Sequence, residues 1–214
     1  RGLFPKKLQP ALDLLPASLP KQEVLPDVYP HKGPLRGRVA LLTGCVQQVL
    51  APEINRATLE VLSANGIETV IPRDQTCCGA LALHTGVEDK SRKTARQLIH
   101  SIPADVDALI TNAAGCGSGI NEYSILFAGE PDEAEAIALA EKTMDISTYL
   151  EQIGLIQPGE LPEEMNVVYH DACHLAHAQR EQAAPRAILS AIPNLNLLEP
   201  PDWEICCGSA GIYN

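Results

Sequence analysis

Cysteine is the residue type with the richest chemistry in this chain of 214 residues. Two sets recur in which a single cysteine precedes an adjacent Cys-Cys pair and a glycine, with 31 intervening residues in the first set and 32 in the second. Thiolates are soft ligands that favour zinc and the iron atoms of iron–sulfur clusters, so the pattern predicts metal or redox chemistry. The seven candidate ligands are Cys45, Cys77, Cys78 and Cys116 in the first set and Cys173, Cys206 and Cys207 in the second.

The two cysteine sets indicate an internal duplication. The offset between Cys45 and Cys173 matches, to within one position, the offset between the two Cys-Cys pairs. Each leading cysteine also follows a short apolar run, at 39–42 and at 167–169. Because the spacing and the context both recur, we interpret the chain as a repeat with a period of about 128 residues.

Adjacent cysteines constrain the backbone that carries them. Neighbouring side chains on an extended strand point to opposite faces, so Cys77 and Cys78 can converge only on a tight loop. The glycine that follows each pair supplies the unusual backbone angles of such a turn. Loops at the carboxyl ends of parallel strands are where open sheets place ligands, so we expect a cage of four thiolates there, suited to an iron–sulfur cluster or to zinc. The alternative is that these are buried cysteines acting as small apolar residues, which does not account for the repeat.

The elements that must position these cysteines alternate between strands and helices. Apolar runs predict buried strands at 39–42 and 108–110 and further strands at 67–71, 167–170 and 195–198. Helices are expected over 52–64, 88–100 and 181–191, with two more within 131–153. This order predicts an α/β fold of two duplicated lobes, each a mostly parallel sheet with crossover helices.

Prolines suggest the domain boundaries. Seven of the 17 prolines lie within residues 1–36, which predicts a proline-rich extended arm or linker. We expect the first cysteine-rich repeat over 37–160 and the second over 161–214. The counterpart of Cys116 would lie near position 245, so the natural chain is expected to continue and the second repeat to be truncated here. Alternatively, His174 completes the second set.

Charge and hydropathy exclude several classes of function. The chain has 16 Lys and Arg against 27 Asp and Glu, a net charge of −11, which argues against a nucleic-acid partner. No apolar stretch reaches the length of a membrane helix, and no secretory signal is visible. Clustered thiols without such a signal indicate a reducing compartment, so a cytoplasmic location is expected.

Several other motifs invite a functional interpretation. The glycines of 115–119 lack the Gly-Lys-Ser/Thr of a phosphate-binding loop, so we expect them to let the backbone turn close to the cysteines. His170 and His174 are candidate ligands or donors to a metal-bound sulfur, whereas His84 and His177 are better explained as ordinary loop histidines. Asp171 is expected to order its loop.

These residues together resemble a known family. The two Cys-Cys-Gly motifs resemble the cysteine-rich repeat of the heterodisulfide reductase family, which the iron–sulfur subunits for lactate utilisation and of glycerol-3-phosphate dehydrogenase share. The segments 169–177 (YHDACHLAH) and 206–214 (CCGSAGIYN) are most similar to those of glycolate oxidase iron–sulfur subunits. The resemblance covers about residues 37–214.

The resemblance implies an oxidoreductase subunit that carries electrons and has no catalytic residue of its own. It implies a 4Fe–4S type cluster and a flavin-containing partner that oxidises a 2-hydroxy acid, foremost glycolate. It also implies a quinone or another electron acceptor, an upstream ferredoxin-like domain, and a complex that is peripheral at the inner face of the cell membrane.

The sequence departs from the family pattern at one position. Many members have Cys-x-x-Cys where this chain has Cys116 followed by Gly119, so the fifth thiolate of a non-cubane cluster is missing. An ordinary four-thiolate cluster and a zinc site therefore remain open. So do two other functions, a thiol–disulfide oxidoreductase and a zinc-stabilised interaction module.

Overall fold

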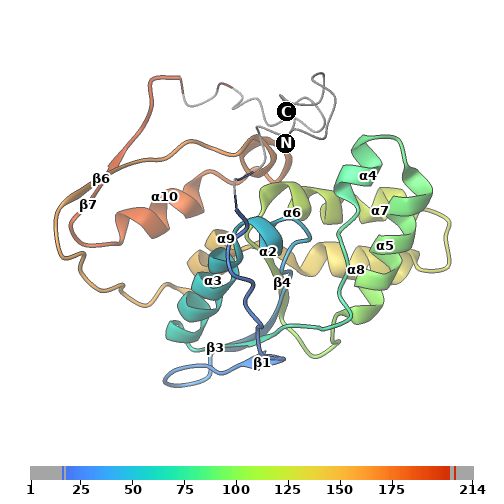
Figure 1. Ribbon diagram of the computed structural model, residues 1–214, viewed down its shortest axis with the longest axis horizontal. Coiled ribbons are helices and arrows are strands. Elements are labelled where there is room, and N and C mark those ends of the chain that lie inside the picture. The colour runs from blue at the N-terminus through green and yellow to red at the C-terminus, as the bar shows by residue number, and fades with distance from the viewer. Residues whose placement is uncertain (1–15, 17, 203–204, 206–214) are drawn as a thin grey trace.

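The computed structural model describes residues 16, 18–202 and 205 (Figure 1). Its main sheet has five strands in the order β1-β3-β2-β4-β5. β2, β3, β4 and β5 pair in parallel, whereas β1 runs antiparallel to β3 along one edge. The strands are β1 (Val28–Tyr29), β2 (Gly37–Leu41), β3 (Ile67–Val70), β4 (Ala108–Thr111) and β5 (Thr143–Asp145). The predicted α/β fold with a mostly parallel sheet is confirmed.

Both faces of this sheet are buried, as a continuous apolar strand requires. Val39 and Leu41 face one core, and Ala40 and Leu42 face the other. The first core also contains side chains from α3 (Pro52–Ala64) and α9 (Ile146–Ile153). The second is covered by helices that Figure 1 shows on the right of the sheet. They are α4 (Ala80–His84), α5 (Glu88–Ser101), α6 (Ala114–Asn121), α7 (Tyr123–Leu126) and α8 (Glu133–Lys142).

A second, parallel pair of strands repeats the first with the predicted period. β6 (Met165–Val168) pairs with β7 (Leu195–Leu198). Met165 lies opposite Leu195, as Gly37 lies opposite Ile67, so both partners are shifted by the same offset that separates Cys45 from Cys173. The turn before the second strand also recurs, because Gly66 and Asn194 both have positive φ, +80° and +66°. The duplication is therefore present in the backbone as well as in the cysteine spacing.

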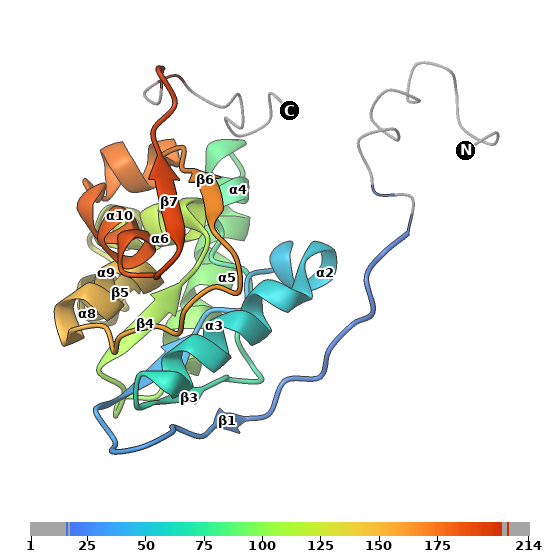
Figure 2. The same ribbon diagram turned by 90° about the vertical axis from the view of Figure 1, so that its left-hand side faces the viewer.

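The second repeat packs onto the first. Its helix α10 (Ala183–Ser190) lies against α9 (Figure 2), and a turn of π-helix, η2 (His174–Ala178), lies against α6. The order of β6, α10 and β7 follows the expected strands and helix. No helix among the described residues has the length and apolar character needed to cross a membrane.

Seven short elements among the described residues were not expected from the sequence, namely α4, α6, α7 and η2 and the three described next. β5 separates the two helices predicted within 131–153, and α2 (Gln47–Leu50) follows the first cysteine. Within the proline-rich segment, β1 pairs with β3, and the amide of Ile71 donates to the carbonyl of Asp27 over 2.8 Å. An edge strand needs partners on one side only, which is compatible with nearby prolines. Residues 1–15 and 17 of the predicted arm lie outside the described residues.

Candidate metal centre

The first four cysteines lie at the carboxyl end of the main sheet, as predicted. Cys45 is in the loop after β2, and Cys77 and Cys78 lie between β3 and α4. Cys116 is in the first turn of α6, directly beyond β4. Parallel strands bring their carboxyl ends to one edge, so residues that are far apart in sequence meet there.

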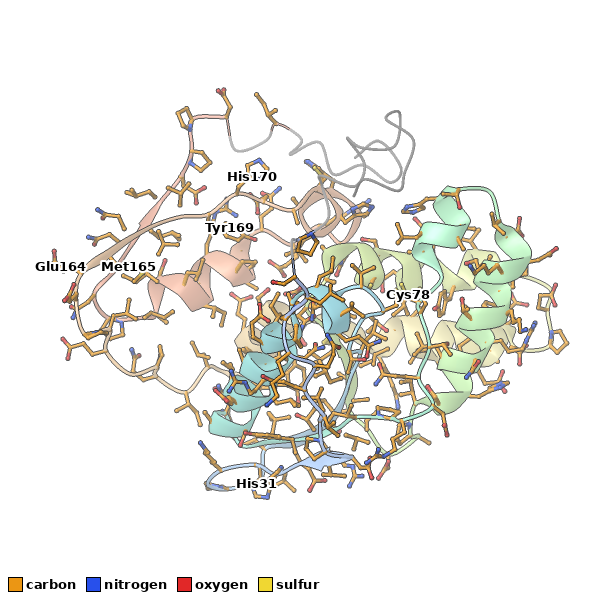
Figure 3. All side chains as sticks on the ribbon, in the orientation of Figure 1. His31, Cys78, Glu164, Met165, Tyr169 and His170 are labelled. Carbon is orange, nitrogen blue, oxygen red and sulfur yellow. The ribbon has the colours of Figure 1, made fainter. Side chains whose placement is uncertain are left out.

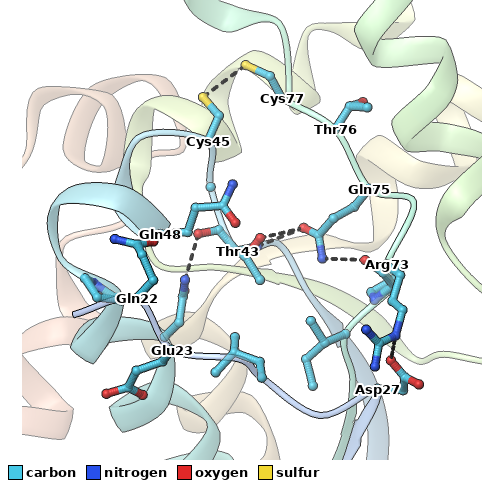
Figure 4. Close-up of a pocket in the computed structure, with 16 residues that line it drawn as sticks. Gln22, Glu23, Asp27, Thr43, Cys45, Gln48, Arg73, Gln75, Thr76 and Cys77 are labelled. Atoms are coloured by element: carbon cyan, nitrogen blue, oxygen red, sulfur yellow. Dashed lines mark hydrogen bonds and ion pairs between the residues drawn. The ribbon is translucent and has the colours of Figure 1, made fainter. Parts of the chain in front are cut away.

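The four thiols form a continuous line of contacts. Cys45 Sγ donates to Cys77 Sγ over 3.3 Å (Figure 4). Cys77 interacts in turn with Cys78, and Cys78 with Cys116, closely enough for each pair to shift its pKa values. Exposure falls along the line from Cys45, which is exposed, to Cys78, which is only 4% exposed. The structure therefore brings together the complete first set.

Gly79 makes the convergence of Cys77 and Cys78 possible. Its φ is +85°, and a Cβ at this position would lie 2.7 Å from Ser91 Oγ, so the turn requires glycine. The amide of Gly79 points at Cys77 Sγ over 3.4 Å, and the amide of Ala80 bonds to the sulfur of Cys78. The expected tight turn is confirmed, and it also directs backbone N–H groups at two sulfurs.

The close approach of the thiols changes their acidity. The hydrogen bond that Cys78 donates to Cys116, together with burial, raises the pKa of Cys78 to about 12. The hydrogen bond to Cys78 and burial raise the pKa of Cys77, and burial raises that of Cys45. Accepting the hydrogen bond of Cys78 lowers the pKa of Cys116. Without a bound cation, most of these sulfurs are therefore protonated near pH 7, and a metal would supply the charge that lets them all ionise.

Two polar side chains that the sequence did not single out support the Cys-Cys loop. The amide oxygen of Gln75 accepts from the amide of Thr43 over 2.9 Å (Figure 4), and its nitrogen donates to the carbonyl of Leu41 over 3.2 Å. From the other side, the buried Tyr123 hydroxyl donates to the carbonyl of Cys78 over 2.7 Å. A glutamine or tyrosine in a loop or helix carries no sequence signal for such a role.

The helical setting of Cys116 corrects one expectation. The glycines of 115–119 lie within α6 and do not form a turn. A Cβ at Gly119 would lie 2.6 Å from the Cβ of Ala80, and one at Gly117 would lie 2.9 Å from Gln179 Nε2. These glycines are therefore needed because α4 and the segment after η2 approach α6 closely.

Cys173, the first residue of the second set, lies at the same site together with its neighbour His174. A cavity of about 670 Å³ is lined by Cys45, Cys77, Cys78 and Cys116 and also by Cys173 and His174. The imidazoles of His84 and His174 stack with a centroid separation of 5.9 Å at this cavity. Cys206 and Cys207 lie outside the described residues, so their part in the second set stays a prediction.

Two of the remaining candidates near Cys173, Asp171 and His170, have structural partners. Asp171, 3% exposed, accepts two hydrogen bonds from Arg186 of α10, at 2.7 and 2.9 Å, and so orders its loop. Figure 3 shows Tyr169 and His170 on the chain that leads from β6 toward this region. His170 Nε2 donates to the carbonyl of Ile205 over 2.8 Å, and His177 is exposed on η2.

The donor set suits an iron–sulfur cluster, and zinc also takes four thiolates. Four cysteine thiolates are the usual ligands of a 4Fe–4S cluster. Among the residues that the structure describes, no three His, Cys, Asp or Glu side chains are arranged to hold one metal ion. A smaller polar pocket of about 250 Å³ reaches Cys45 and Cys77 from the side of Gln22 and Gln48 (Figure 4).

Comparison with known proteins agrees with this donor set. The cysteine-rich domain family CCG matches residues 39–121 and 167–214. A Bacillus subtilis (strain 168) protein named "Probable glycolate oxidase iron-sulfur subunit" is 38% identical over 95% of this chain. "Lactate utilization protein A" of Shouchella clausii (strain KSM-K16) is 29% identical over 82% of this chain. The chain spans 49% of the Bacillus protein and 74% of the Shouchella protein.

Proposed function

Because this chain belongs to the cysteine-rich CCG domain family, we propose that it is the iron–sulfur electron-transfer subunit of a flavin-dependent 2-hydroxy-acid dehydrogenase, with glycolate as the substrate of the complex. The observation that carries the proposal is the line of four contacting thiols at the carboxyl end of the sheet. The relatives named for glycolate oxidase and for lactate utilization support the choice of substrate class.

In this proposal the ligands are Cys45, Cys77, Cys78 and Cys116, and the bound group is a 4Fe–4S cluster. The cluster supplies the ability to take up and release single electrons. The chain holds the sulfurs in place and directs the amides of Gly79 and Ala80 at two of them. Such N–H···S hydrogen bonds and the burial of Cys78 set the reduction potential.

The other steps of the reaction belong to partner chains. A flavin-containing subunit would oxidise the 2-hydroxy acid and pass electrons to this chain, and a quinone would accept them on the cytoplasmic side of the membrane. An upstream ferredoxin-like domain would carry electrons between these sites. The exposed Cys45 is the sulfur of the site that such partners can approach most closely.

The acidity of three of the four thiols favours this proposal over a thiol–disulfide oxidoreductase. Such enzymes attack with a thiolate whose pKa is lowered. Here burial and neighbouring thiols raise the pKa values of Cys45, Cys77 and Cys78, which disfavours these three as free nucleophiles. The hydrogen bond from Cys78 lowers the pKa of Cys116, so the argument does not extend to that residue.

The test is metal and sulfide analysis of an anaerobic preparation. We expect iron with acid-labile sulfide and a paramagnetic signal on reduction, and we expect glycolate to reduce the centre only after the flavoprotein partner is added. Cys77→Ser and Cys78→Ser should each remove the signal and most of the iron, because each deletes a ligand. Thr76→Ser is the matched control in the same loop, since serine keeps the hydroxyl that donates to the carbonyl of Thr94.

Three results would contradict the proposal. Zinc without sulfide would indicate a structural module. Unchanged iron in both cysteine variants would separate these residues from the metal. Reduction by glycolate with this chain alone would overturn the division of labour between subunits.

A further inference from the structure

The second repeat supplies one wall of the cavity that the first four cysteines line. Cys173 and His174 are its contribution. Cys173 is separated from Cys45 by the same offset that relates the two strand registers, so each cysteine follows the equivalent strand of its repeat. The duplication therefore places the two equivalent cysteines, Cys45 and Cys173, in the lining of one cavity.

The position of Cys173 is fixed by contacts between the repeats. Ser118 Oγ donates to the carbonyl of His174 over 3.1 Å, and Gln179 Nε2 donates to the carbonyl of Ala114 over 2.9 Å. Both bonds join the ends of η2 to α6, the helix that carries Cys116. The Asp171–Arg186 pair holds the chain just before Cys173. The cysteine is thus presented by a segment secured on both sides.

A further thiolate for the first centre cannot come from position 119. A side chain at Gly119 would meet the Cβ of Ala80 at 2.6 Å, and it would point at α4. Cys173, in contrast, already lines the cavity. Position 119 therefore cannot supply a fifth sulfur, whereas Cys173 is placed to do so.

We propose that Cys173 is a ligand of the same centre as Cys45, Cys77, Cys78 and Cys116, so that both repeats build one five-sulfur site. The inference rests on the proposed function, because it assigns a residue to the cluster proposed there. It differs from the prediction that Cys173 belongs with Cys206 and Cys207 to a separate centre.

Alkylation of the cysteines tests this assignment without changing the sequence. The chain is treated anaerobically with iodoacetamide before and after reconstitution with iron and sulfide, and each cysteine is quantified by mass spectrometry. We expect reconstitution to slow the alkylation of Cys173 at least tenfold, together with that of the first four cysteines, while Cys206 and Cys207 react as before. Alkylation of Cys173 at an unchanged rate, or its protection together with Cys206 and Cys207, would overturn the proposal.

Variants give an independent measurement. Cys173→Ser should shift the paramagnetic signal and the visible absorption of the centre, because it replaces a sulfur with an oxygen. Cys206→Ser should leave both spectra unchanged, and His177→Ala controls for disturbance of η2, on which His177 is exposed. If Cys173→Ser and Cys206→Ser instead each remove the same amount of iron and leave the remaining spectrum unaltered, Cys173 serves a separate centre.

The failures of the two proposals can be told apart. A wild-type chain that takes up no iron and sulfide contradicts the proposed function. A wild-type chain that takes up both, with Cys173 unprotected, contradicts only the assignment of Cys173.

Discussion

Gln75 links the Cys-Cys loop to the strand beside it through both ends of its side-chain amide. Its oxygen accepts from the amide and the hydroxyl of Thr43, and its nitrogen donates to the carbonyls of Leu41 and Pro72. Thr43 lies two residues before Cys45, so one side chain fixes the approach of two cysteine-bearing segments.

We therefore expect Gln75→Ala to destabilise the chain and loosen the centre. Unpaired backbone groups in this partly buried loop should lower the free energy of unfolding by about 1–3 kcal/mol. Urea unfolding of the apo chain measures this loss, and the rate of iron removal by a chelator should rise in the reconstituted chain. Gln97→Ala is the control, because Gln97 makes one exposed bond to the carbonyl of Asp74. Equal chelation rates for the two variants would contradict the role of Gln75.

At the scale of residues, sequence patterns could predict which cysteines form the site, but not the side chains that hold their loops in place. Paired thiols followed by glycine have few structural explanations, and the turn at Gly79 confirms the one chosen. The roles of Gln75 and Tyr123 depend on which carbonyls lie nearby, and that is decided by tertiary structure. The placement of Cys173 beside the first set depends likewise on how the repeats pack.

At the scale of elements, the centre depends on the close packing of α4 against α6. Gly119 and Ala80 are the contact point, and each helix starts within three residues of a cysteine of the site. Glycine in a helix costs about 1 kcal/mol relative to alanine, so its presence in α6 needs a packing reason.

We expect Gly119→Ala to destabilise the chain by about 1–3 kcal/mol, because the clash with Ala80 outweighs the gain in helix propensity. Ala80→Gly removes the Cβ with which the new side chain would clash. The free energy of unfolding of the double variant should therefore fall by less than the sum of the decreases in the two single variants. Thermal unfolding of the three variants measures this coupling. Additive losses would mean that the two positions do not determine the distance between the helices.

Periodicity predicted five helices, α3, α5, α8, α9 and α10, and the strands β2, β3 and β4, whose sheet is buried and apolar on both faces. The short elements were missed for a physical reason. β5 has three residues, and α6 is rich in glycine, a poor helix former that is retained for close packing. A residue pattern of such length or composition does not distinguish a helix or strand from a loop.

At the scale of the whole molecule, the excess of acidic residues is partly compensated by ion pairs. Asp132 precedes α8 and contacts Arg96 of α5 at 2.5 Å and His100 at 3.2 Å. The Arg96 guanidinium and, more weakly, His100 lower the pKa of Asp132 below its usual value.

This pair should make stability fall in acid. A carboxylate whose pKa is lower in the folded chain than in the unfolded chain stabilises the fold at pH values above its unfolded pKa of about 3.8. This stabilisation is lost as the pH falls through the folded pKa. We expect Asp132→Asn to unfold at lower urea than wild type at pH 7 and the difference to shrink below pH 4. Asp89→Asn, at an exposed residue of α5, is the control. A difference that stays constant between pH 7 and pH 3 would contradict this linkage.

The line of sulfurs from exposed Cys45 to buried Cys78 has a consequence for damage by air. Oxidation of cysteine follows exposure, so dioxygen should reach one end of the site first. Brief exposure of the apo chain to air should join Cys45 Sγ and Cys77 Sγ, 3.3 Å apart, in a disulfide, with two electrons and two protons passing to dioxygen. Peptide mapping should find this lesion before any oxidation of Cys78, and the reverse order would contradict it. The exposed end of the site, where we propose that electrons enter or leave, is then also the end that dioxygen damages first.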